Sequence, residues 1–530
     1  MAAEGKLVSG RTRNEPSSGH PHGVQCQQEV NGAMTSINLG MSDNEKQEPE
    51  GRNLLQRHAF VVTYMMSNML DDLQAAVKGQ FRYNFFHNLY ASQLSKFNIT
   101  RECGVALMPE VQEIENSISR ETIQWEMYSQ YVTTLPCIVA AFIIALRSDR
   151  IGRRLGYLLP YVVMTLDFML LAVIIRLKLH FGFTLVGDFI KSLSGGYIAM
   201  NLTAYALISD THGKKGEAEK ESSPSDNEKS QKEDSDELDM SRENQRALKI
   251  VSLTVAKTFL SSLLSLVTGY IIQRTGSFYT LCGVIVLKIL LFTFAYTFIA
   301  ETSQQKKSSG FFAPVKTIFL TTKNPRKRRT LLLVNLAAIF TVVSYVTEFE
   351  VMRIYQMSPP FCLNSVDLGH VSSETRFRAI VTIPLLWLWR KIGLTESTIA
   401  AIGVVCEIIG TVLLATVRKI WVFFAAPIIA VPGLLCSSMT KIIISRLVGR
   451  QALASSFAAM LAIDELFGFA GGQAGSYLYK TFIDTVPTAT FYMATATFTV
   501  SAIMYTIESI LQHSYAKKDA SGQSTVPVSP

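Results

Sequence analysis

Charged residues are scarce in this sequence. They make up 17% of the 530 residues, whereas hydrophobic residues make up 48%. The apolar residues stand in long blocks and do not form the short periodic stripes of a soluble core. A helix needs roughly 20 apolar residues to cross the hydrocarbon layer of a bilayer, so such blocks are typical of membrane spans. The composition therefore argues against a soluble globular domain and predicts an all-α polytopic membrane protein.

Cysteine is scarce as well, and the spacing of the seven cysteines does not fit a metal site. The sequence also lacks a phosphate-binding glycine loop and a nucleophile elbow on a predicted aqueous surface. Residues 1–52 lack the apolar core of a cleavable signal peptide, so we expect the first span to target the chain. We expect no enzymatic activity, no cofactor and no metal.

About twelve apolar blocks are long enough to span a bilayer. The first is unusually polar because it contains Asp71 and Asp72, and the eighth contains Arg376 and Arg378 near its start; a polar inner face would explain both. The predicted spans are 59–77, 125–146, 156–176, 184–208, 248–272, 279–300, 331–352, 371–389, 395–417, 421–440, 455–478 and 488–511.

Basic residues occur in alternate loops. They crowd 147–154, 214–249 and 306–329, whereas 354–368 has none. By the positive-inside rule, we expect these basic loops and both termini to be cytoplasmic. This distribution accounts for the formal net charge of +8 without a nucleic-acid partner, and it makes the lipid bilayer the expected surroundings.

The predicted organisation alternates groups of spans with polar segments. Because the N-terminal tail and the insert before the fifth span cannot bury enough apolar surface to order themselves, we expect both to be disordered. The predicted parts are a tail at 1–52, spans one to four in 53–208 with a long outer loop at 78–123, a cytoplasmic insert at 209–246, spans five and six in 247–300, a basic loop at 301–330, spans seven to twelve in 331–511, and a tail at 512–530.

The long outer loop contains an acceptor triplet for N-glycosylation, Asn98-Ile99-Thr100. A second triplet begins at Asn201, within a predicted span. Since only the first lies on the side predicted to face outward, we expect Asn98 to be glycosylated and Asn201 to stay unmodified.

The connection between the second and third spans reads Ser-Asp-Arg-Ile-Gly-Arg-Arg over residues 148–154. Gly152 permits a tight turn, and Asp149 can accept a hydrogen bond from Arg153 or face the positive end of a helix. We interpret this pattern as a conformational latch, and the alternative is that its arginines only set the topology. The residues assigned to the latch are Asp149, Arg150, Gly152, Arg153 and Arg154. The pattern resembles the loop signature of the major facilitator superfamily.

Three further segments in the same order make the chain similar to solute carrier family 46, which includes proton-coupled folate and haem carriers. They are residues 355–362 (YQMSPPFC), 445–452 (SRLVGRQA) and 477–481 (YLYKT). The resemblance covers about residues 55–511. It implies the major facilitator fold, with two six-helix bundles around a central cavity that opens alternately to either side.

The resemblance also implies a disulfide between Cys103 and Cys362. Both cysteines fall in predicted outer loops, where an oxidising environment lets a disulfide persist. Two positions depart from the family pattern: Val251 stands where the folate carrier has a carboxylate, and Lys441 replaces an arginine, losing its planar fork. These departures argue against folate transport by that route of proton coupling.

Ionisable residues within spans are costly and mark candidate solute or proton pathways, although buried ion pairs and side chains that reach the interface are the alternative. The candidates are Asp71, Asp72, Glu348, Glu350, Arg376, Arg378, Glu407, Lys441 and Asp464. We expect at least one of the deeper carboxylates, Glu348, Glu407 and Asp464, to titrate. Gly471, Gly472 and Gly475 form a small-residue cluster suited to close helix packing or to sliding.

Together these features predict a transporter of a small, anionic organic solute, driven by its own gradient or by protons. Arg376, Arg378 and Lys441 are the cations expected to hold the solute. The alternative is a transporter-like sensor or scaffold without net flux. We expect a multi-pass protein of the plasma membrane, with an endolysosomal membrane as the alternative, and the oligomeric state stays open.

Overall fold

The computed structural model describes residues 50–95, 108–201, 203, 231–299, 325–447 and 453–520. Helices account for nearly all of these residues, and no β-strand occurs among them. The all-α fold class predicted from the apolar blocks is confirmed.

The first group of helices comes from the N-terminal half of the chain. Gly195 and Gly196, with φ of 74° and 44°, make the turn after α5, and the chain is helical again over 196–201. Gly276 interrupts α7 with φ 78° and ψ 164°, a conformation that a residue with a side chain rarely adopts. The elements are α1 (Glu50–Leu89), α2 (Ala91–Leu94), α3 (Pro109–Ile151), α4 (Arg153–Leu177), η2 (Phe181–Phe183), α5 (Thr184–Leu193) and α7 (Gln231–Phe298).

The second group comes from the C-terminal half. Local sequence fixes several helix starts: Pro325 begins α9, and Asn364 forms a capping box with Asp367 at the start of α10. The elements are α9 (Pro325–Met357), α10 (Ser365–Phe377), η3 (Arg378–Ile380), α11 (Thr382–Lys391), α12 (Glu396–Thr416), α13 (Val422–Ile429), η4 (Val431–Gly433), α14 (Leu434–Leu447), α15 (Leu453–Phe482) and α16 (Ala489–Ala520).

Helices α1 and α3 are 40 and 43 residues long, about twice the length of a simple span. Residues 78–89 and 109–123, which the sequence suggested as outer loop, are helical because the two extensions hold each other. The Tyr90 hydroxyl donates to Glu121 over 2.8 Å, which raises the pKa of the Tyr90 phenol, and Arg82 pairs with Glu126. The predicted polar segments are also helical over 231–246, 325–330 and 512–520.

Two predicted spans are broken. The segment 371–389 is divided among α10, η3 and α11, and the segment 421–440 among α13, η4 and α14. The second break contains Pro432, which cannot donate a backbone hydrogen bond, and the helices on either side are bent by 47°.

Five of the described helices are long and apolar enough to cross a membrane, and six if the bent pair around η4 forms one span. Helix α1 is too polar for this criterion because it carries Asp71, Asp72, Lys78 and Arg82. The count of about twelve spans stays a prediction.

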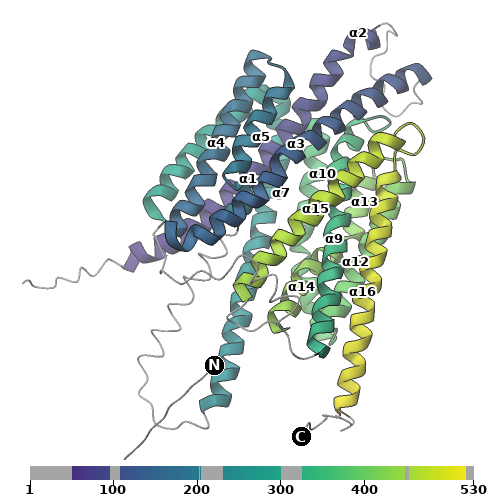
Figure 1. The fold of residues 1–530 in the computed structure, drawn as a ribbon. Helices are drawn as coiled ribbons and strands as arrows, with labels where there is room; N and C mark the ends of the chain where they lie inside the picture. Colours follow the sequence, from purple (N-terminus) through teal and green to yellow (C-terminus); the bar gives the residue numbers. More distant parts are fainter. Residues whose placement is uncertain are drawn as a thin grey trace, which may run out of the picture. The chain divides into compact units, whose positions relative to one another are not determined.

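Within the described residues from Glu50 onward, the helices pack as two groups (Figure 1). Helices α1, α3, α4, α5 and α7 contact one another, and α9, α12, α14, α15 and α16 do the same. The groups meet where α10 lies along α7 and where α15 lies against α3.

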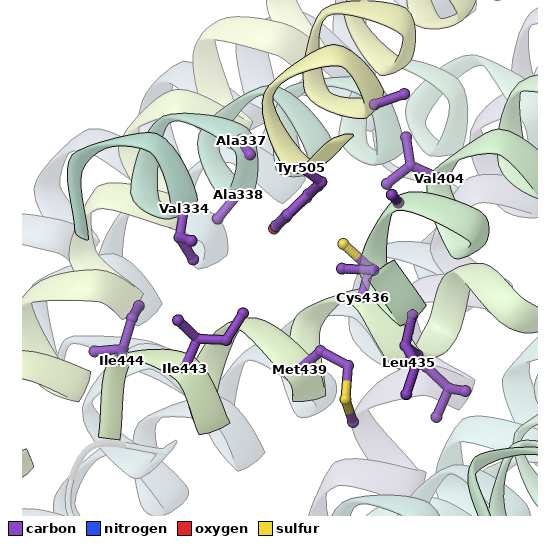
Figure 2. Close-up of a cluster of buried hydrophobic side chains, with 14 of the residues drawn as sticks. Val334, Ala337, Ala338, Val404, Leu435, Cys436, Met439, Ile443, Ile444 and Tyr505 are labelled. Atoms are coloured by element: carbon purple, nitrogen blue, oxygen red, sulfur yellow. The ribbon is translucent and has the colours of Figure 1, made fainter. Parts of the chain in front are cut away.

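One apolar core of the second group lies among α9, α12, α14 and α16. Figure 2 shows Tyr505 of α16 extending into the space between Ala338 of α9 and Cys436 of α14. The Tyr505 hydroxyl and Thr440 Oγ1 form a hydrogen bond of 2.6 Å, so the buried phenol is satisfied. This core holds α9 and α12, which carry Glu348, Glu350 and Glu407 of the cavity described below.

Candidate functional site

A cavity of about 510 Å³ lies between the helices of the second group and the edge of the first. Its apolar lining includes Val346, Phe349, Leu414 and Phe423. Six lining residues are ionisable: Glu348, Glu350, Arg378, Glu407, Asp464 and Glu465. A mostly apolar hollow with a few charged groups is the usual form of a small-molecule site.

The structure brings together five of the residues predicted from the sequence as pathway candidates. Glu348 and Glu350 come from α9, Glu407 from α12, Arg378 from η3 and Asp464 from α15. Charged residues within apolar blocks were a sufficient signal for these five, because a charge survives in a span only where it faces a partner or a cavity.

Arg378 is held by main-chain acceptors. Its Nε donates to the Thr375 carbonyl over 2.9 Å and its Nη1 to the Pro427 carbonyl over 3.0 Å. The Pro427 carbonyl can accept this bond because it lies in the last turn of α13, where backbone carbonyls have no donor within the helix. These two bonds orient the guanidinium, whose Nη2 makes no hydrogen bond within the part of the chain that the structure describes.

Two carboxylates accompany Arg378. Glu407 is buried, and its Oε1 accepts a hydrogen bond of 2.6 Å from Tyr345. Glu348 Oε2 accepts from Thr411 over 3.0 Å. Both carboxylates lie within electrostatic range of Arg378. This part of the cavity can therefore exchange a proton and bind an anionic group.

The other polar part of the cavity lies where the two groups of helices meet. Tyr197 donates to Glu465 over 2.5 Å, which joins residues 196–201 to α15. Gln473 donates to Gln130 of α3 over 2.6 Å, and Gln130 also contacts Glu350. Nothing in the sequence pattern points to Gln130 or Tyr197, because uncharged polar residues are common in spans and only the fold brings these two to the cavity.

The remaining predicted pathway residues lie elsewhere. Asp71 pairs with Lys288 at 2.5 Å, and Lys288 is fully buried. Asp72 accepts from Ser261 over 2.5 Å and lies 3.6 Å from Arg376, which itself donates to Ser265. Asp71, Asp72 and Arg376 therefore form ion pairs, which is the alternative to a place on the solute or proton pathway.

Lys441 and Arg376 are not among the residues that line the cavity. Lys441 belongs to α14 and interacts electrostatically with Asp464. Arg376 lines a smaller pocket beside Asp72 and Arg353. Of the three cations expected to hold the solute, Arg378 alone is a lining residue of the cavity.

A charge network that the sequence did not predict lies in the first group of helices. Lys78 pairs with Asp188 at 2.5 Å, and Lys191 lies 3.1 Å from Asp167 and 3.3 Å from Asp188. Asp188 also accepts from Ser129 over 2.7 Å and is 1% exposed. Lys78 follows directly after the predicted first span at 59–77, so the hydropathy pattern places it in the outer loop and not in the membrane interior.

The predicted latch is described only in part. Gly152 has φ 106° at the start of α4, the kind of tight turn expected there. The Arg154 guanidinium donates to the Tyr296 carbonyl and lies 4.8 Å from the centre of the Tyr296 ring. The side chains of Asp149, Arg150 and Arg153 lie outside the described part of the structure, so the latch stays a prediction.

Two other predictions fall on segments outside the described residues. Asn98 and Cys103 both lie in 96–107. Glycosylation of Asn98 and the disulfide between Cys103 and Cys362 therefore stay predictions. Within the described residues, no group of three or more His, Cys, Asp or Glu is placed to hold a metal ion.

Several polar contacts join the two groups of helices on the side of the α15–α16 connection. Ser119 and Ser358 share a hydrogen bond of 2.7 Å, Asp484 accepts from Arg120 over 2.6 Å and from Asn116 over 3.0 Å, and Gln80 donates to Ser365. The predicted topology places these residues on the outer side.

The fold resembles those of solved transporters. The human organic anion transporter MFSD10 aligns with a TM-score of 0.53 and 13% identity, covering 87% of this chain and 100% of that one. An auto-inhibited peptide transporter of the POT family aligns with a TM-score of 0.54 and 10% identity, covering 87% and 97%. The chain therefore has the fold of the major facilitator transporters.

No family model matches the chain. Among curated proteins, the proton-coupled folate transporter of Bos taurus is 19% identical over 84% of this chain and 90% of its own length. The lysosomal proton-coupled steroid conjugate and bile acid symporter SLC46A3 of Mus musculus is 23% identical over 72% and 78%. These relatives are members of solute carrier family 46, which confirms the resemblance seen in the sequence. They are transporters and not enzymes, and the comparisons support a membrane transporter.

Proposed function

We propose that this protein carries a small organic solute across a membrane by alternating access, with protons as the coupling ion and the cavity as the binding site. The observation that carries this proposal is the cavity of about 510 Å³, which Arg378 lines together with Glu348 and Glu407, both within its electrostatic range. The volume is within the range of small-molecule sites. The names of the relatives, which are proton-coupled transporters, support the same function.

Arg378 is the group that we assign to an anionic part of the solute. An ionised Glu407 competes with the solute for the positive charge of Arg378. A proton on Glu407 removes this competing charge, so a proton and an anionic group bind more tightly together than either binds alone. Linkage requires that each ligand strengthen the other by the same factor. The same site then couples the two fluxes.

The contacts around Ser358 and Asp484 support an assignment of this structure to a state that is closed on the outer side. A carrier must break these contacts to admit a solute from outside, and a solute or proton shifts the balance only if it binds the two states unequally. We assign the protein to the plasma membrane with both termini in the cytoplasm, as the positions of the basic loops favour. An endolysosomal membrane is the alternative.

Uptake by purified protein in liposomes tests the proposal without knowledge of the solute. The vesicles are given an acidic exterior and the small-molecule fraction of a cell extract, and their contents are analysed by mass spectrometry. We expect wild-type vesicles to accumulate particular solutes and Arg378→Gln vesicles to accumulate them about tenfold less, since a hydrogen bond to a charged group contributes about 1.5–3 kcal/mol.

Arg390→Gln is the matched control, because Arg390 is a half-exposed arginine of α11 that pairs with Glu396. It should accumulate the same solutes as the wild type. If wild-type vesicles contain no more of any solute than empty vesicles, the carrier function is wrong. That result would favour the transporter-like sensor or scaffold.

A further inference from the structure

The cavity holds more negative groups than the proposed coupling needs. Five carboxylates and one guanidinium are among its lining residues. Glu348 and Glu407 take part in the proposed proton coupling beside Arg378. Glu350, Asp464 and Glu465 do not take part in that coupling, and a purely anionic solute would have to lie against them.

Asp464 and Glu465 lie on a different wall from Arg378. Arg378 belongs to η3, which packs on α7, α10 and α11. Asp464 and Glu465 belong to α15, which packs on α3, α9 and α16. The lining between the walls includes the apolar residues Val346 and Phe469. The cavity therefore has a cationic position and an anionic wall with apolar surface between them.

Glu465 is the carboxylate of this wall best suited to bind a ligand. Glu350 interacts with Arg82 and Arg353, and Asp464 interacts with Lys441, so protein cations already offset both. The hydrogen-bond partner of Glu465 is the neutral phenol of Tyr197, at 2.5 Å. A carboxylate in a cavity binds an ammonium or similar cation well because the surroundings screen the attraction weakly.

We propose that the transported solute is amphoteric, with an anionic group that binds Arg378, an apolar body, and a cationic group that binds the wall of α15 at Glu465. This inference rests on the proposed function and specifies its class of substrate. Charge complementarity at both ends selects against wrong solutes, because a solute with only one charge leaves the other position unpaired.

The liposome uptake experiment described above, with Glu465→Gln added, tests this inference. We expect the solutes that depend on Arg378 to carry both an acidic and a basic group. Their uptake should fall about tenfold in Glu465→Gln. Glu113→Gln is the matched control, because Glu113 is an exposed carboxylate in the second turn of α3 and is not among the lining residues, and it should behave as the wild type does.

A second measurement has a wild-type arm that does not depend on the folding of any variant. Each accumulated solute is compared with its N-acetyl derivative, which lacks the basic charge. In the wild type, acetylation should reduce uptake about tenfold, and in Glu465→Gln acetylation should have little further effect because the two changes remove the same interaction.

The outcomes separate the two proposals. Solutes that depend on Arg378 but lack a basic group, or acetylated solutes taken up as well as their parents by the wild type, would overturn the amphoteric class and leave the carrier intact. Uptake that persists in Arg378→Gln would likewise overturn the amphoteric site, and absence of any uptake above that of empty vesicles would remove both proposals.

Discussion

Glu407 is the residue on which the proposed proton coupling depends most. It is buried, it accepts a hydrogen bond from Tyr345, and it lies within range of Arg378. An ionised carboxylate beside a second one, Glu348, is relieved of repulsion when it takes up a proton. In the proposed function, its protonation links external acid to solute binding.

Replacing Glu407 with Gln imitates the protonated side chain permanently. Uptake by the wild type should rise as the external pH falls, whereas uptake by Glu407→Gln should be nearly independent of pH. Exchange of labelled for unlabelled solute, which needs no net proton movement, should persist. Both rates are measured in the liposome system with Glu113→Gln as control. Acid stimulation of Glu407→Gln equal to that of the wild type would assign the coupling to another group.

Asp188 balances two lysines in the interior of the first group. Asp188→Asn has nearly the same shape but leaves Lys78 and Lys191 with Asp167 as their acidic partner in the network. Removing one partner of a buried pair costs about 3–5 kcal/mol. We expect a clear fall in the unfolding temperature of the purified protein. Adding Lys78→Met restores the balance of charge, so the double variant should be more stable than Asp188→Asn; if it is less stable, the network is not held by charge balance.

Single residues differ in how far the sequence could predict their surroundings. Glu348 and Glu407 were recognisable because charges are rare in apolar blocks, and both line the cavity. Asp71 carried the same signal but pairs with Lys288, which is 217 positions away and is brought near by folding alone. The sequence pattern thus identifies which residues are costly to bury, whereas the fold decides whether a cavity or an ion pair compensates the cost.

At the scale of elements, close packing of α15 on α9 depends on glycine. A side chain at Gly471 would place its Cβ 2.8 Å from the Val343 carbonyl oxygen, and Thr347 donates to the Gly471 carbonyl over 2.9 Å. Of the two roles predicted for the glycine cluster, the structure shows close packing. Because α9 and α15 both carry cavity carboxylates, their separation sets the spacing of those groups.

Gly471→Ala should therefore separate the two helices or strain them. Overpacking costs about 1–3 kcal/mol, more than the gain of about 1 kcal/mol from replacing glycine within a helix. We expect a lower unfolding temperature and slower solute uptake. Gly283→Ala is the control, since nothing lies within 4 Å of its added Cβ, and it should be neutral or stabilising. An unchanged unfolding temperature for Gly471→Ala would show that α15 can shift freely.

The junction of α3 and α4, where Gly152 alone separates the two helices, carries the latch hypothesis. If an ion pair of Asp149 and Arg153 favours one state by about 1.4 kcal/mol, its loss shifts the balance between states about tenfold. Asp149→Ala should lower maximal uptake, while solute binding stays within a few-fold of the wild type. Arg153→Lys should be milder than Arg153→Ala. Full uptake by both alanine variants at equal protein abundance would leave these residues as topology signals.

Element boundaries were harder to predict than element type. Hydropathy located the apolar centre of each span, but it carries no information about where a helix continues into water. Helices α1 and α3 extend beyond their predicted spans because contacts between residues distant in sequence hold the extensions together. Arg82 pairs with Glu126, and the Tyr90 hydroxyl donates a hydrogen bond to Glu121. The break at η4 is marked by Pro432, and Pro384 in the first turn of α11 marks the break at η3, because it cannot donate a hydrogen bond to the carbonyl of Ile380.

At the scale of the whole molecule, the two groups of helices are joined on the predicted outer side by contacts of unequal strength. Arg120 and Asp484 are 36% and 55% exposed, so their pair contributes little. The bond between Ser119 and Ser358 is buried. It joins α3 to the end of α9 and is the better point at which to hold the two groups together.

The most direct test of transport by alternating access is a reversible lock at this point. The Ser119→Cys, Ser358→Cys double variant places two thiols where hydroxyl oxygens now lie 2.7 Å apart, so a disulfide should form on oxidation. Each single variant controls for disulfide formation between an introduced cysteine and a native cysteine such as Cys362. In liposomes that contain a pH-sensitive dye, we predict that solute-driven proton entry stops when the double variant is oxidised and returns when it is reduced. Undiminished proton and solute entry through fully cross-linked protein would contradict the account.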